Sequence, residues 1–128
     1  MSQDCQNTPP LRPASLDWQD DVPFSRDFGD VYFSRDDGAA ETRHVFIGQN
    51  DLPARWQHWH TPGSFVIGET GFGTGLNFLC AWELWRQARR PGQHLHVVSV
   101  EKFPLGRDDL ERACALRPDF ADMAAQLL

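Results

Sequence analysis

A glycine-rich segment between an apolar run and an amphipathic stretch constrains the fold of this chain more than any other feature. Residues 65–67 predict a short strand, and glycines then occupy alternate positions of residues 71–75. Apolar side chains recur at helical spacing over residues 76–88, and residues 94–100 predict a second strand. A strand, a loop, a helix and a strand in this order predict an α/β fold with parallel strands and a right-handed crossover.

The chain has the size of one ordinary domain. It contains 128 residues, of which 41% are hydrophobic and 12% aromatic, and this content is sufficient for a packed core and excludes a disordered tail. The net charge of −6 comes mainly from residues 1–63, which hold ten acids and five bases. No basic stripe of the kind that grips a phosphate backbone is present in the sequence. A nucleic acid would therefore depend on a few local arginines or on residues outside this chain.

Cysteine usage and hydropathy indicate a cytoplasmic setting. Cys5, Cys80 and Cys114 are odd in number and widely separated, and they form no C-x-x-C pair, so a disulfide framework is not expected. Residues 1–13 contain an acid and three prolines in place of the apolar run of a signal peptide. No apolar run approaches the ~20 residues that a spanning helix requires, so no membrane association is expected.

The sequence divides into three parts. Residues 1–15 are polar and rich in proline, which predicts a flexible lead, and residues 16–63 predict an N-terminal preface. Residues 64–128 predict the first part of a Rossmann-like domain. Beyond the second strand, this part has further helical patterns at residues 105–116 and from Phe120 onward.

The preface is predicted to contain a hairpin and a short helix. An Asp-Asp-Gly turn signal at residues 36–38 separates the apolar residues 31–33 from the apolar residues 44–47. Such a turn between aromatic and β-branched runs predicts a β-hairpin. Residues 52–59 predict a short helix, and a Thr-Pro-Gly sequence follows it and breaks the chain.

The glycine loop indicates a nucleotide-like ligand. Glycines let a ligand approach bare backbone, and the start of the following helix offers unpaired amides. The pattern Gly71-x-Gly73-x-Gly75 differs from the dinucleotide pattern G-x-G-x-x-G, which needs glycine or alanine at Leu76. A Walker loop is excluded, because no Gly-Lys-Ser/Thr follows the glycines.

Two acids narrow the choice of ligand. Glu69 is expected at the tip of the first strand, where a carboxylate repels a pyrophosphate and favours a cationic ligand such as S-adenosylmethionine. Glu101 ends the second strand, 26 positions after Gly75, where an acid can accept from both ribose hydroxyls. Phe103 is predicted either to lie against an adenine ring or to pack in the core. The sequence leaves open whether the side chain of Lys102 points toward the ligand or away from it.

Other groupings in the sequence favour structural roles. No third metal ligand accompanies the histidine pairs at residues 58/60 and 94/96, so no metal site is expected. The tryptophan pairs at residues 56/59 and 82/85 favour core or interface packing over base stacking. The arginines at residues 86, 89 and 90 favour a charge complement to the C-terminal end of their helix.

The loop residues resemble the first motif of class I S-adenosylmethionine-dependent methyltransferases, which has the form E/D-x-G-x-G-x-G. The longer strings at residues 68–79 and 99–105 are similar to one branch in particular. That branch is the tRNA 5-methylaminomethyl-2-thiouridine methyltransferase domain of MnmC-type bifunctional enzymes. Residues 28–34 and 41–47 match it as well, so the resemblance runs from about residue 16 to residue 116.

The resemblance implies transfer of a methyl group to the amine of 5-aminomethyl-2-thiouridine at the wobble position of tRNA. It implies S-adenosylmethionine as cofactor, tRNA as partner and a monomer for the complete protein. FAD is implied only where a fused C-terminal oxidase domain follows. The cofactor-binding residues that it implies are Glu69, Thr70, Gly71, Phe72, Gly73, Thr74, Gly75, Glu101, Lys102 and Phe103.

The family's fold has a seven-stranded sheet and a substrate-side aspartate on a later strand, in a D-x-F-like stretch. We therefore expect a class I methyltransferase sheet that is truncated after its second βα unit, with the catalytic residues encoded after Leu128. Two other functions stay open at this point. One is an aminopropyltransferase-like enzyme, and the other is a non-catalytic nucleotide-binding module.

Overall fold

The computed structural model describes residues 9–32 and 38–128. Its centre is a parallel pair of strands, β4 (Gly63–Thr70) and β5 (Gln93–Val100), joined by helix α3 (Leu76–Ala88). Their register runs from Gly63 opposite Gln93 to Thr70 opposite Val100. This confirms the predicted order of strand, glycine loop, helix and parallel strand.

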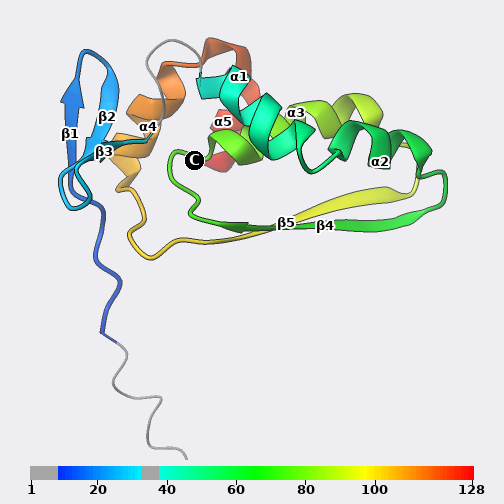
Figure 1. The fold of residues 1–128 in the computed structure, drawn as a ribbon, viewed down its shortest axis with the longest axis horizontal. Coiled ribbons are helices and arrows are strands. Elements are labelled where there is room, and N and C mark those ends of the chain that lie inside the picture. The colour runs from blue at the N-terminus through cyan, green and yellow to red at the C-terminus, as the bar shows by residue number, and fades with distance from the viewer. Residues whose placement is uncertain (1–8, 33–37) are drawn as a thin grey trace, which may run out of the picture.

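Helices cover one face of this strand pair (Figure 1). Phe65 and Ile67 point toward the helices, whereas Val66, Val98 and Val100 lie on the opposite face and are largely exposed. Strand residues alternate between faces, so the two burial patterns fix the orientation of the sheet.

An aromatic cluster joins the sheet to α3 and to α2 (Leu52–His58). Trp56 is 1% exposed and packs edge-on against Trp85, with ring centroids 5.1 Å apart. Phe65 packs edge-on against Trp56 from β4. The predicted short helix and the core role of these tryptophans are both confirmed. Such edge-to-face pairs add about 0.5–1.5 kcal/mol each to the burial of their area.

Arg90 follows α3, but its guanidinium donates hydrogen bonds to carbonyl oxygens at the end of α2. It donates to the carbonyl oxygens of Trp59 at 2.6 Å and Gln57 at 3.1 Å, at the C-terminal end of α2. Gln93 donates to the same Trp59 carbonyl. The predicted complement to the end of α3 is therefore wrong for Arg90, because the carbonyls at the end of α2 lie within its reach.

The N-terminal preface contains an antiparallel sheet of β1 (Leu16–Gln19), β2 (Val22–Ser25) and β3 (Asp30–Val31). Gln19 pairs with Val22, so Asp20 and Asp21 form a two-residue turn, and both have positive φ. A turn of this kind matches the twist of its strands, and aspartate tolerates the left-handed conformation.

The preface thus contains an antiparallel β-hairpin, as the sequence predicts, but the hairpin lies at residues 16–25 and its predicted location at residues 31–47 is wrong. Residues 44–47 belong to a π-helix, η2 (Arg43–Gly48), which continues from α1 (Gly38–Thr42). The two aspartates of the predicted turn lie outside the described residues. In η2 the buried residue is Ile47, which joins the aromatic core, while Val45 is 52% exposed. Packing against the core therefore overrides the strand propensity of this apolar run.

The C-terminal part forms helix α4 (Arg107–Ala115), a 3₁₀ turn η3 (Pro118–Phe120) and helix α5 (Ala121–Leu127). Phe120 and Met123 pack against Leu79 and Cys80 of α3, as the helical spacing predicts. Over residues 9–32 and 38–128, no helix has the length and apolar character needed to cross a membrane.

Candidate functional site

The glycine loop connects the end of β4 to the start of α3. Gly71, Gly73 and Gly75 have φ values of +80°, +57° and +78°, a region that residues with a side chain rarely occupy. A Cβ at Gly75 would also lie 2.9 Å from Cζ of Phe72. The alternate glycines are therefore required by the backbone conformation, and they leave bare backbone at the carboxyl edge of the sheet.

Glu101 joins the glycine loop to the turn that follows β5. Its Oε2 accepts from the backbone N–H of Gly73 at 3.1 Å, and its Oε1 accepts from the N–H of Phe103 at 3.0 Å. The structure thus brings together Glu101 and the loop, two features that the sequence analysis assigned to one site. Both donors are backbone amides, so the carboxylate is held in place without another side chain.

Glu69 has a different environment. It is 7% exposed, and its two oxygens accept from side chains, Ser99 Oγ at 2.8 Å and Asn77 Nδ2 at 2.9 Å. Ser99 lies opposite Glu69 in the parallel register, and Asn77 is the second residue of α3. Neither partner stands out in the sequence, although the strand register places Ser99 opposite Glu69.

A cavity of about 520 Å³ lies beside Glu101. It is lined by Phe28, Gly71, Val100, Glu101, Lys102 and Phe103. The Phe28 and Phe103 rings are 5.5 Å apart and tilted by 56°. Lys102 Nζ lies 5.4 Å from the centroid of the Phe103 ring, which gives this lysine a position that the sequence left open. The lining therefore combines a carboxylate, bare backbone and two aromatic rings.

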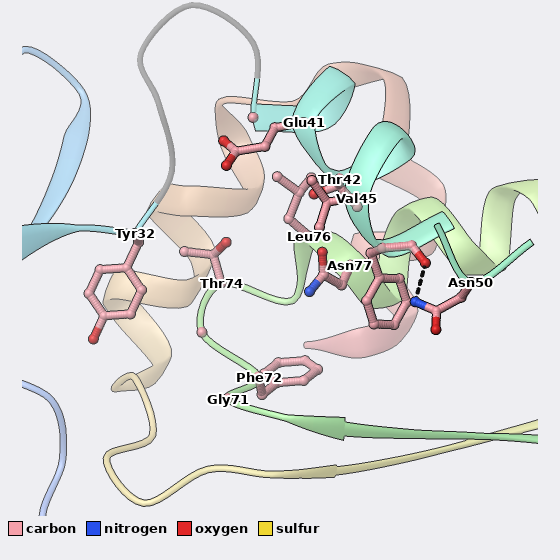
Figure 2. Close-up of a pocket in the computed structure, with 13 residues that line it drawn as sticks. Tyr32, Glu41, Thr42, Val45, Asn50, Gly71, Phe72, Thr74, Leu76 and Asn77 are labelled. Atoms are coloured by element: carbon pink, nitrogen blue, oxygen red, sulfur yellow. Dashed lines mark hydrogen bonds between the residues drawn. The ribbon is translucent and has the colours of Figure 1, made fainter. Parts of the chain in front are cut away.

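A second cavity, of about 380 Å³, lies between the loop and the preface (Figure 2). Phe72, Gly73 and Thr74 line it from the loop, and Asn77 lines it from α3. The remaining lining comes largely from the preface, with Glu41 as the charged residue among those that line it. Glu69 and Thr70 line neither of the two cavities.

Tyr32 packs against the loop from the end of β3. Its Cδ1 lies 3.5 Å from the position that a Cβ would take at Gly73. Burial raises the pKa of the Tyr32 phenol, and the negative charges of Glu101, Asp27 and Asp109 raise it further. The phenol therefore stays protonated and neutral at neutral pH.

Metal binding finds no support in the described part of the chain. Within it, no group of three or more histidine, cysteine, aspartate or glutamate side chains is placed to hold an ion. Cys80 and Cys114 are buried free thiols, and burial raises the pKa of both. These cysteines are therefore poor nucleophiles.

The fold and the loop together define a parallel α/β unit with a glycine-rich loop at the carboxyl edge of its strands. A solved structure, the crystal structure of MNMC2 from Aquifex aeolicus, matches 82% of this chain with a TM-score of 0.52. The chain covers 36% of that structure at 21% sequence identity, so this likeness concerns the fold alone. No protein-family model matches the chain.

Curated relatives point to a particular family. The tRNA 5-methylaminomethyl-2-thiouridine biosynthesis bifunctional protein MnmC of Pseudomonas fluorescens is 57% identical over 121 residues, or 94% of this chain. The protein of the same name from Methylobacillus flagellatus is 52% identical over 120 residues. The chain spans about a fifth of these relatives, 18% of the length of each. It is therefore homologous to one segment of the MnmC proteins.

Proposed function

We propose that this chain forms the S-adenosylmethionine-binding part of a methyltransferase that acts on tRNA. The methyl acceptor would be the amine of 5-aminomethyl-2-thiouridine at the wobble position, and the product 5-methylaminomethyl-2-thiouridine. The relatives' names support the tRNA pathway. The observation that carries the cofactor proposal is the contact of the Glu101 carboxylate with the Gly73 amide beside a cavity of suitable size.

In this proposal Glu101 accepts from the two ribose hydroxyls of the cofactor. Its oxygens are already aligned by the amides of Gly73 and Phe103, so little reorganisation is needed on binding. Each carboxylate oxygen has a further lone pair for a hydroxyl donor. Phe103 offers its ring to the adenine, and the bare backbone of the loop from Gly71 to Gly75 lets the cofactor approach closely.

Glu69 contributes in two ways. Its negative charge favours the sulfonium and ammonium groups of the cofactor over a pyrophosphate. It also holds the amide of Asn77, which lines the second cavity. Thr70, Phe72, Thr74 and Lys102 are proposed to shape the same cofactor site from the loop and from the turn after β5.

The wider assignments follow from the family likeness. S-adenosylmethionine supplies the methyl group, and a nearby base that takes the amine proton would lie outside this chain. FAD would belong to a fused oxidase part, as the word bifunctional in the relatives' names suggests. For the whole protein we propose a cytoplasmic location and a monomer. Within this chain we propose a lead over residues 1–15, a preface over residues 16–63 and the cofactor-binding part from residue 64 onward.

Calorimetric titration with S-adenosylhomocysteine tests the proposal, with NAD as the comparison ligand. We expect one molecule of S-adenosylhomocysteine to bind per chain and NAD to give no heat of binding, because NAD carries a pyrophosphate. Binding of NAD in preference to S-adenosylhomocysteine, or of neither by the folded protein, would contradict the proposal.

A further inference from the structure

The N-terminal antiparallel sheet lies next to α4 (Figure 1), and Phe28 of this part of the chain lines the cavity next to Glu101. Trp18 Nε1 donates to Asp109 Oδ1 at 2.9 Å, and the guanidinium of Arg112 lies 4.3 Å from the centroid of the Trp18 ring. Arg112 also pairs with Asp21 at 3.5 Å. The sheet is thus fixed to α4 by contacts between residues that lie far apart along the chain, 91 residues in the case of Trp18 and Asp109.

The connection between β2 and β3 carries Phe28 to the cavity. The hydroxyl of Ser25 accepts from the N–H of Phe28 at 3.2 Å, and the carbonyl of Ser25 accepts from the N–H of Gly29 at 2.9 Å. Ser25 itself is 7% exposed, so it is a firm anchor for this turn. Phe28 is therefore held in a defined position and does not lie on a free loop.

Phe28 is unusually exposed for an aromatic residue in such a position. It contacts the ring of Phe103, yet 66% of its surface is open to solvent. Plain packing against Phe103 leaves most of the ring uncovered, and an exposed apolar surface at a cavity is typical of a ligand-contacting position. The same cavity is lined by the carboxylate of Glu101.

A ligand that suits both groups has an aromatic base next to vicinal hydroxyls. The hydroxyls would donate to Glu101, and the base would cover the exposed ring of Phe28. Stacking on an aromatic side chain depends on the π-face of the base and tolerates a tilted platform. A ribonucleoside fits this description, and a purine covers more of the ring than a pyrimidine does.

We propose that Phe28 contacts the purine of the bound nucleoside, so that the N-terminal sheet is part of the ligand site. This inference rests on the proposed function and extends it to a residue outside the glycine loop and the turn after β5. Ser25 and Trp18 are then positioning residues, because they hold the turn and the sheet that carry Phe28.

The variants Phe28→Leu and Phe28→Tyr test the inference, with Val31→Ala as the matched control. Val31 lies on the same sheet, is 47% exposed and lines neither cavity. Dissociation constants are measured for S-adenosylhomocysteine and for methylthioadenosine, which carries the base and ribose without the amino acid. Phe28→Leu should weaken both ligands by about 10-fold, while Phe28→Tyr stays within about 2-fold of the original protein. Val31→Ala should change neither constant.

Equal affinities of Phe28→Leu and the original protein for S-adenosylhomocysteine would overturn the inference and leave the proposed function standing. A Phe28→Leu protein that no longer folds would also contradict it, because the ring would then be a structural contact. Failure of the original folded protein to bind S-adenosylhomocysteine would remove the proposed function first, and the inference with it.

Discussion

Each of the two central strands has a glutamate at its carboxyl end, and the two glutamates differ in their hydrogen-bond partners and in their exposure. Glu69 at the end of β4 is buried, and side chains donate to both of its oxygens. Glu101 directly after β5 is half-buried, accepts from backbone amides and lines a cavity of about 520 Å³. The difference shows that the position of an acid at a strand end does not define its role, whereas its partners and its access to the cavity do.

This difference has an energetic side. Loss of a buried acceptor leaves its donors without partners, and each unpaired buried donor costs about 1–3 kcal/mol. The amides held by Glu101 are next to an open cavity, where water can replace the carboxylate. Glu69 is therefore expected to act mainly on stability, and Glu101 mainly on the ligand.

The largest expected effect is that of Glu69→Ala on stability. It leaves Ser99 and Asn77 without their acceptor and should lower the free energy of unfolding by about 3 kcal/mol. Glu101→Ala is the matched comparison, and its cost should be about 1 kcal/mol, because water reaches the freed amides. Urea unfolding followed by tryptophan fluorescence measures both, and equal losses for the two variants would break the contrast.

A smaller effect is expected for Ser99→Ala. It removes one donor to the Glu69 carboxylate and keeps the other from Asn77, so the free energy of unfolding should fall by about 1 kcal/mol. Ligand affinity should stay unchanged, because Ser99 lines neither cavity. Urea unfolding and calorimetry of the same sample give the two values. A clear loss of affinity without a loss of stability would contradict the structural role of Glu69.

The third prediction concerns the titration of Tyr32, which is the one tyrosine in the sequence. Burial first, and then Glu101, raises the pKa of its phenol above the ordinary value of 10.0. The folded state therefore holds this proton more tightly than the unfolded chain does. Its contribution to stability is present below pH 10.0 and is lost as the pH rises through the raised pKa of the folded state.

Replacing Glu101 by glutamine should lower the pKa of Tyr32, whereas replacing Glu69 by glutamine should leave it unchanged. The cause is the charge of Glu101, which contributes to the shift of Tyr32, while Glu69 is absent from its causes. Absorbance of the tyrosinate during an alkaline titration measures the effect directly. An equal decrease of the Tyr32 pKa in both variants would contradict this prediction, because Glu69 would then act on the phenol as strongly as Glu101 does.

The sequence predicts those parts of the site that depend on the spacing of residues close together along the chain. The spacing of the glycines from Gly71 to Gly75 and the placement of Glu101 after a strand follow from the chain itself. The partners of Glu69 depend on strand register and helix phase, and Ser99 lies 30 residues away from Glu69 along the chain. Phe28 reaches the cavity only because the preface folds onto α4, which no local pattern indicates.

The preface was predicted less well than the strands and helices after residue 63. The apolar run at residues 44–47 has strand propensity, yet it forms part of a helix because Ile47 packs into the aromatic core. The hairpin turn at Asp20 and Asp21 contains no glycine, so the sequence pattern does not indicate it. In both places the deciding interactions are tertiary contacts or backbone conformations that residue type alone does not specify.

The central claim is that Glu101 acts mainly on the ligand, whereas Glu69 acts mainly on the stability of the fold and adds only its charge to ligand binding. Calorimetric titration of S-adenosylhomocysteine into Glu101→Gln and Glu69→Gln, with the thermal midpoint of each protein, tests it most directly. The account predicts that Glu101→Gln raises the dissociation constant by about 10-fold, since a charge-assisted hydrogen bond to the ribose is lost, and lowers the midpoint less than Glu69→Gln does. Glu69→Gln should lower the midpoint and bind the ligand more nearly as the original protein does. The reverse pattern, with binding lost in Glu69→Gln and retained in Glu101→Gln, would contradict the account.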